Sequence, residues 1–230
     1  FSVSITASGT IKLEGLNASG TVILAAESTS AEVVPNVQYQ LVVDLDLADT
    51  GSRMVKLNGS DVTMTWTTYT DDEIEFYRSS TQYLSVGNLA STQTAFNGSM
   101  GQLWFDDSYH GFDGSEFYNT EFSMAIPLGE SGELPTGSSP PVFWEGYAGP
   151  TEVHLTNSGA TADFSSGGDT TAPLAVVQMN LYNPAAVTNN NGNATSNHVD
   201  YMKLTGMGGS NGHVSWTMVL WVHNQDTSLS

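Results

Sequence analysis

Carboxylates are the residues of this sequence whose number and spacing could do chemistry. Calcium takes six to eight oxygen ligands from carboxylates, carbonyls and water, and irregular loops supply such oxygens readily. The segment 106–116 carries four carboxylates and two glycines, although its spacing is not that of an EF-hand loop. A calcium site and a solvated acidic loop are both open interpretations of it. The candidate ligands are Asp106, Asp107, Asp113 and Glu116, with Asp44 and Asp46 from a second acidic run.

The charge balance restricts the partners that this chain can have. It holds 24 Asp and Glu against 5 Lys and Arg, a formal net charge of −19. So few cations cannot form a phosphate-binding patch or hold the chain at an anionic bilayer, which argues against nucleic-acid and membrane partners. Copies of the chain should repel one another over a Debye length of about 8 Å at physiological salt. Self-association therefore requires high salt or bound divalent cations.

No arrangement of nucleophiles or metal ligands in the sequence has the spacing of a known catalytic motif. The chain has no cysteine, and its 5 histidines form no H-E-x-x-H pair. Residues 208–212 match G-x-S-x-G, but a strand follows them instead of the helix that a nucleophile elbow needs, so they indicate a hairpin turn. His198 and Asp200 share one face of a short extended segment and indicate a turn histidine beside a surface carboxylate. The sequence predicts a protein that is not an enzyme.

A carbohydrate site is the alternative from another functional class. Glu145 and Glu152 could act as the two carboxylates of a glycosidase, and Trp144 and Tyr147 could stack on sugar rings. With 24 carboxylates, however, accidental pairs are common, and buried aromatics beside a surface glutamate explain the same residues. A secreted carbohydrate-binding module or glycosidase stays as an alternative hypothesis.

The elements that must position these residues are strands. Apolar and polar residues alternate with period two along several runs, which are separated by breaks rich in Gly, Asn, Ser and Pro. In the run 37–47, Val43 and Leu45 share one face and Asp44 and Asp46 the other. The last run is apolar on both faces, as in a strand buried on each side. The predicted strands are 1–7, 37–47, 62–67, 121–126 and 214–222.

These patterns predict an all-β fold and a single domain over residues 1–230. The expected architecture is an antiparallel β-sandwich or jelly roll with long loops, because no window shows a helical stripe of apolar residues. The chain begins with Phe1 and contains no apolar stretch long enough for a membrane span. We interpret it as a mature chain whose leader has been removed, and hence as an extracellular or cell-surface protein.

Four N-x-S/T sequons add candidate glycosylation sites. Chance sequons are expected in a sequence so rich in Asn, Ser and Thr, so each one is a weak signal by itself. The candidate acceptors are Asn17, Asn58, Asn97 and Asn193.

The segment 8–13, Ser-Gly-Thr-Ile-Lys-Leu, resembles the opening strand of the TasA/camelysin-like extracellular fibre proteins. The closing apolar run 214–222 is also similar in character. This broad group includes archaeal bundling pili and calcium-dependent cannulae. The resemblance implies jelly-roll subunits that polymerise by donor-strand complementation, in which a terminal strand of one subunit completes the sheet of its neighbour. No zinc motif supports the peptidase activity associated with camelysin.

The matching donor strand would be residues 1–7. This run alternates, carries no charge and has Phe1, Val3 and Ile5 on one face, so it could add to the exposed sheet edge of another copy. Pairing within its own sheet is an equally open interpretation. The leading hypothesis is a structural subunit of an extracellular filament, tube or surface layer that assembles with itself, with calcium as a cation bridge. A jelly-roll capsid protein of a virus of a halophile is an alternative with the same acidic composition.

Overall fold

The computed structural model describes residues 1–35, 37–76, 84–86, 88–89, 94–95, 98–137, 139–145, 159–160, 164–167, 170–171, 187–189, 201–204 and 215–224. Within these residues the regular elements are strands, every strand pair is antiparallel, and there is no helix. The all-β prediction is therefore confirmed. No helix in the same part of the chain is long and apolar enough to cross a membrane.

A four-stranded sheet is formed by the first part of the chain. Its strands are β1 (Ser2–Ile5), β2 (Ile11–Leu16), β3 (Val22–Ser28) and β7 (Met64–Tyr69), in that order. The turns from β1 to β2 and from β2 to β3 contain Gly9 and Gly20, with φ of 81° and 82°. Glycine is the residue that adopts this left-handed conformation at no steric cost. β1 is an edge strand of the sheet and pairs with β2.

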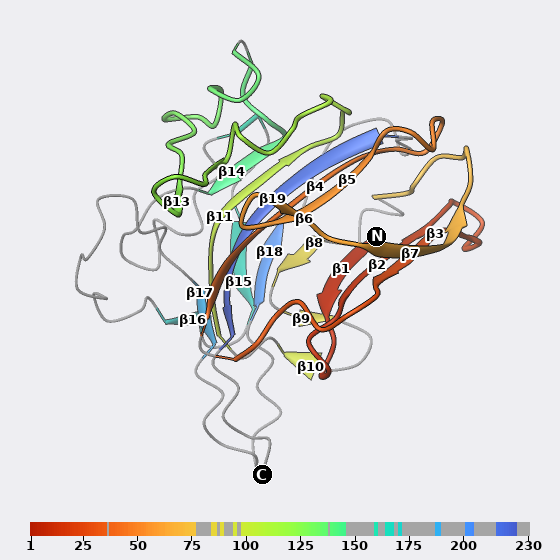
Figure 1. Cartoon of the computed structure of the whole chain (residues 1–230), viewed down its shortest axis with the longest axis horizontal. Coiled ribbons are helices and arrows are strands. Elements are labelled where there is room, and N and C mark those ends of the chain that lie inside the picture. Colours follow the sequence, from red (N-terminus) through yellow and green to blue (C-terminus); the bar gives the residue numbers. More distant parts are fainter. Residues whose placement is uncertain are drawn as a thin grey trace.

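The second sheet has eight strands and runs through the centre of the molecule (Figure 1). β19 (Ser215–Asn224) lies in its middle, between β11 (Gly98–Asp106) and β4 (Gln38–Asp46). The other members are β5 (Arg53–Leu57), β6 (Ser60–Asp61), β14 (Phe143–Glu145), β16 (Thr170–Thr171) and β17 (Val187–Asn189). Smaller sheets are β12 (Tyr118–Asn119) with β13 (Met124–Ala125), β9 (Asn88–Leu89) with β10 (Thr94–Ala95), and β15 (Phe164–Gly167) with β18 (Tyr201–Leu204) and β8 (Leu84–Val86).

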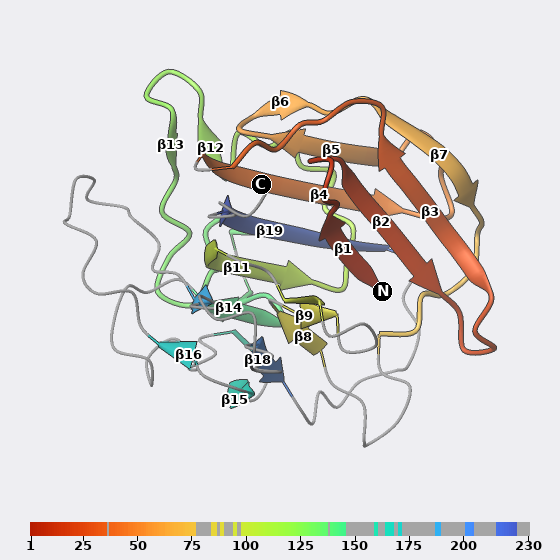
Figure 2. The same cartoon turned by 90° about the horizontal axis from the view of Figure 1, so that it is seen from below.

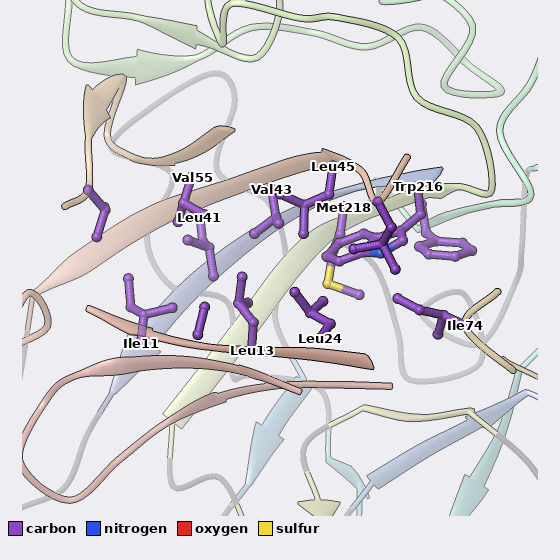
Figure 3. Close-up of a cluster of buried hydrophobic side chains, with 14 of the residues drawn as sticks. Ile11, Leu13, Leu24, Leu41, Val43, Leu45, Val55, Ile74, Trp216 and Met218 are labelled. Carbon is purple, nitrogen blue, oxygen red and sulfur yellow. The ribbon is translucent and has the colours of Figure 1, made fainter. Parts of the chain in front are cut away.

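The main hydrophobic core lies between the two large sheets (Figure 3). Ile11, Leu13 and Leu24 of the four-stranded sheet point towards Leu41 and Val43 of the eight-stranded one. This packing is a β-sandwich, as predicted. The jelly-roll form is not established by the strand order, because β1, β2 and β3 are successive hairpin neighbours within one sheet rather than parts of paired Greek keys.

The outer face of the large sheet is covered as well. Trp216 and Met218 of β19 point into the main core, whereas Val219 packs in a second cluster on the opposite side. That second cluster also contains Phe117 and Leu128, which belong to residues 107–137, named here the cover segment. Figure 2 shows this part of the chain, with β12 and β13, running beside the end of the large sheet. Residues 216–219, the part of β19 whose burial the structure describes, are buried on both faces, as predicted for the run 214–222.

The predicted strand at 121–126 is wrong over most of its length. The structure forms only β13 there, with Met124 and Ala125. Ser123 has a φ of 51°, a left-handed conformation that interrupts an extended strand, and Phe122 is 66% exposed. The alternation of residue types in this run was therefore accidental.

Candidate functional site

Two of the candidate carboxylates lie in one row across the large sheet. Asp106 of β11 is directly opposite Thr217 of β19, and Thr217 is directly opposite Asp44 of β4. Directly paired residues point to the same face of a sheet, so the three side chains are neighbours beneath the cover segment. Sequence spacing could not show this, because Asp44 and Thr217 are 173 residues apart.

Asp44 is completely buried and accepts three hydrogen bonds. Its Oδ2 accepts from the backbone N–H of Phe112 at 2.9 Å, and its Oδ1 accepts from the hydroxyl of Thr217 and, at 3.4 Å, from the N–H of His110. Burial raises the pKa of Asp44, and the bond from Thr217 is the largest of the opposing effects. The carboxylate thus fastens the start of the cover segment to the sheet.

Asp106, the last residue of β11, contacts a histidine of the cover segment. Its Oδ2 lies 2.6 Å from Nε2 of His110, and both side chains are largely buried, at 18% and 22% exposure. Its Oδ1 accepts a hydrogen bond from the N–H of Asp107. His110 also stacks on Phe112, with ring centroids 4.8 Å apart. Asp44 and Asp106 are therefore brought together around residues 108–112, where both serve as contacts for the loop.

Three of the other candidate ligands accept hydrogen bonds from their own turns. Asp113 accepts from Ser115 N–H, Glu116 from Gly114 N–H, and Asp46 from Ala48 N–H. The bonds from Ser115 hold the pKa of Asp113 below its usual range. Asp113 and Glu116 are not brought to Asp44 by any contact in the structure. Across the residues that the structure describes, no three His, Asp or Glu side chains are grouped as a metal ion would require.

Side chains that the sequence did not single out complete the attachment of the cover segment. Gln40 donates from Nε2 to the carbonyl of Phe117, and Trp104 donates from Nε1 to the carbonyl of Gly132, both at 2.8 Å. Thr217 lies 3.2 Å from the carbonyl of Ser108. These sheet residues bind main-chain atoms of the cover. In the sequence, the signal for these contacts was a polar residue inside an otherwise apolar strand, such as Gln40 or Thr217.

The first strand is held by side-chain contacts as well as by its pairing with β2. Val3 and Ile5 pack against the main core, and the ring centroid of Phe1 lies 4.1 Å from that of Trp216 and 5.6 Å from that of Phe76. In the single chain, β1 thus occupies its own sheet, while its outer edge is unpaired among the described strands. Whether it can also join another copy stays a prediction.

The turn after β1 is fixed to the body of the domain. The carbonyl of Gly9 accepts hydrogen bonds from the N–H groups of Glu32 and Val33, and Thr10 donates to Glu27 on β3. A Cβ on Gly9 would collide with the carbonyl oxygen of Val33, so glycine is required there for space as well as for its φ. The strand can therefore leave the sheet only before Thr6.

Part of the proposed carbohydrate site is buried. Trp144 on β14 is 4% exposed and belongs to the cluster beneath the cover, so in this structure its ring is not a platform for a sugar. Glu145 lies opposite Leu103 of β11. Tyr147 and Glu152 lie outside the described residues, as do His198, Asp200, residues 208–212 and the sequons at Asn97 and Asn193.

Comparison with known proteins gives no assignment. No protein-family model, no curated protein and no solved structure matches this chain.

Proposed function

We propose that this protein is a structural subunit of an extracellular filament, tube or surface layer that assembles by exchange of strand β1 between copies. The observation that carries the proposal is the position of β1, an edge strand without charged side chains, whose Val3 and Ile5, together with Phe1 just before it, are partly buried against the main core. When an edge strand moves from its own sheet to the same place in a second copy, every contact is conserved. The free-energy difference between the two states is then small, and concentration favours the polymer.

Other features of the chain agree with a structural role. Natural proteins protect sheet edges with charges or proline, whereas the sequence of β1 is Ser-Val-Ser-Ile. Removing the strand would expose Trp216 and Phe76, which gives an incoming Phe1 a defined aromatic position. The candidate carboxylates are used within the fold, which supports a structural rather than a catalytic part for them.

A disulfide between β1 and β2 distinguishes pairing within a chain from pairing between chains. Ser4 is directly opposite Lys12, and the protein has no cysteine of its own. The double variant Ser4→Cys/Lys12→Cys is assembled under reducing conditions, oxidised and run on a denaturing non-reducing gel. We expect a ladder of covalent multimers, because the facing cysteines then belong to different chains. If the variant forms a polymer that is then oxidised but runs only as monomers on the denaturing gel, strand exchange is contradicted.

Two further variants control this experiment. Deleting residues 1–7 should leave folded or partly folded monomers that do not polymerise, and Ser4→Ala, on the outward face of the same strand, should assemble normally. Negative-stain microscopy and sedimentation measure both. Polymers of normal length from the deletion variant would refute exchange of β1, and the absence of any polymer of the parent chain under all ionic conditions would refute the structural role.

Cation bridging is the second part of the proposal. Because each subunit carries a net charge of −19, we expect the critical concentration for assembly to fall as salt rises and to fall further with calcium at equal ionic strength. EDTA should reverse the calcium-specific fall in critical concentration, and it should lower the melting temperature of the polymer. Equal assembly in calcium chloride and in sodium chloride of matched ionic strength would show that screening alone is enough.

A further inference from the structure

Two of the four sequons lie in described turns, and their surroundings differ. Asn17 begins the turn between β2 and β3, and Asn58 begins the turn between β5 and β6. N-linked glycosylation needs the side-chain Nδ2 of asparagine together with space for a saccharide outside the fold. The two turns can be compared on both requirements.

The turn at Asn17 presents its sequon to solvent. Ala18 and Ser19 are exposed. Oδ1 of Asn17 accepts hydrogen bonds from the hydroxyl of Ser19 at 2.7 Å and from the N–H of Thr21 at 2.9 Å, which orients the amide. Nδ2 donates one hydrogen to Asp72 at 2.8 Å, and this bond is the largest cause of the lowered pKa of Asp72. A glycosylated amide retains one N–H, which is sufficient for that bond.

The turn at Asn58 packs against the cover segment, although its Ser60 is exposed. Oδ1 of Asn58 accepts from the N–H of Gln40 at 2.7 Å, so the side chain lies along the sheet. A Cβ added to Gly59 would lie 2.7 Å from Cγ2 of Thr120 and 3.1 Å from Cδ1 of Tyr118, which shows that residues 118–120 rest directly on this turn. The backbone of Asn58 itself has a φ of 51°. A saccharide on Asn58 would have to displace the cover segment.

We infer that Asn17 is a glycan acceptor of the folded protein and that Asn58 is not. The donor is a saccharide carried as a pyrophosphate ester on a lipid. Transfer forms a bond between Nδ2 of Asn17 and C1 of the sugar and breaks the bond from C1 to the phosphate oxygen. The lipid pyrophosphate leaves with the electron pair, and Nδ2 gives up one proton to solvent. This inference does not depend on strand exchange, because the hydrogen bonds that hold the side chain of Asn17 come from its own turn and from Asp72 and not from β1.

Peptide mapping of secreted protein tests the inference. The full chain is expressed behind a secretion leader in a eukaryotic host, with a C-terminal tag that carries an accessible sequon to report that the transferase reached the chain. The folded, secreted pool is treated with a glycan-releasing amidase in heavy-oxygen water, which marks each formerly glycosylated asparagine. We expect the mark on Asn17 and none on Asn58, because chains with a saccharide at Asn58 should fail to fold and remain in the cell.

Matched variants remove each sequon without touching its asparagine. Ser19→Ala should abolish the saccharide at Asn17, whereas Ser60→Ala should leave the mass of the secreted protein unchanged apart from the substitution. If Asn17 is unglycosylated in secreted protein whose tag is glycosylated, the inference is overturned. A folded secreted chain with a saccharide on Asn58 overturns it as well.

Discussion

Replacing Trp104 with alanine should lower the free energy of unfolding by about 3–5 kcal/mol, the usual cost of deleting a large buried aromatic side chain. Trp104 is completely buried beneath the cover segment. Its ring centroid lies 5.5 Å from that of Phe117 and 5.9 Å from that of Phe112. Urea unfolding followed by far-ultraviolet circular dichroism measures the change, and limited proteolysis should cut first within residues 107–137.

Trp104→Phe is the matched control for this prediction. It keeps an aromatic ring but removes the hydrogen bond from Nε1 to the carbonyl of Gly132. Leaving that buried carbonyl unpaired should cost about 1–3 kcal/mol. If both variants change the free energy of unfolding equally, the hydrogen bond and not the packing fixes the cover. A change below about 1 kcal/mol for alanine would mean that the cover does not rest on Trp104.

The second large effect is expected at Asp44. Asp44→Ala should lower the free energy of unfolding by about 2–4 kcal/mol, because the N–H of Phe112 and the hydroxyl of Thr217 lose a buried acceptor. Asp44→Asn should cost much less. Its amide oxygen can accept from Phe112, and its NH₂ can donate to the hydroxyl oxygen of Thr217. The hydrogen of that hydroxyl, which Asp44 accepts in the parent, is then free to bond the carbonyl of Ser108.

Comparing the free energies of unfolding of the parent and Asp44→Asn over a range of pH tests whether the pKa of Asp44 is raised. Burial raises the pKa of Asp44, so the folded protein binds this proton more tightly than the unfolded chain. The contribution of Asp44 to stability is therefore largest below its unfolded pKa of about 3.9 and declines as the pH rises through the folded value. As the pH rises through that window, the free energy of unfolding of the parent should fall relative to that of Asp44→Asn. Above the window the difference between the two should become constant. A constant difference at all pH values would contradict a raised pKa.

The sequence correctly predicted those strands in which the burial of each face alone determines the pattern of apolar and polar residues. The run 214–222 is apolar on both faces, and residues 216–219, where burial is described, are buried on both faces, with Trp216 in one core and Val219 in the other. In the same way Val43 and Leu45 face the main core while Asp44 faces away from it. Period-two alternation reports such positions because each face of a sheet is either packed or not.

What the sequence could not predict depends on contacts between distant residues. Asp44 is part of an acidic run and therefore suggested a cation ligand, yet its partners are Phe112 and Thr217, 68 and 173 residues away. Trp144 beside Glu145 suggested a sugar platform, but the register of β14 on β11 places Trp144 opposite Trp104 under the cover. In each case the residue type was informative, and only the strand pairing decided what surrounds it.

The turn that follows β1 has a mechanical consequence for a polymer joined through this strand. Residues 6–10 are hydrogen-bonded to one another and to the body of the domain, so the chain can cross to a neighbour only before Thr6. Residues 1–5 span about 17 Å when fully extended. Adjacent subunits must then lie in direct contact, since no slack linker separates them. Such a joint resists bending because each subunit can tilt only as far as the surfaces of its neighbours permit.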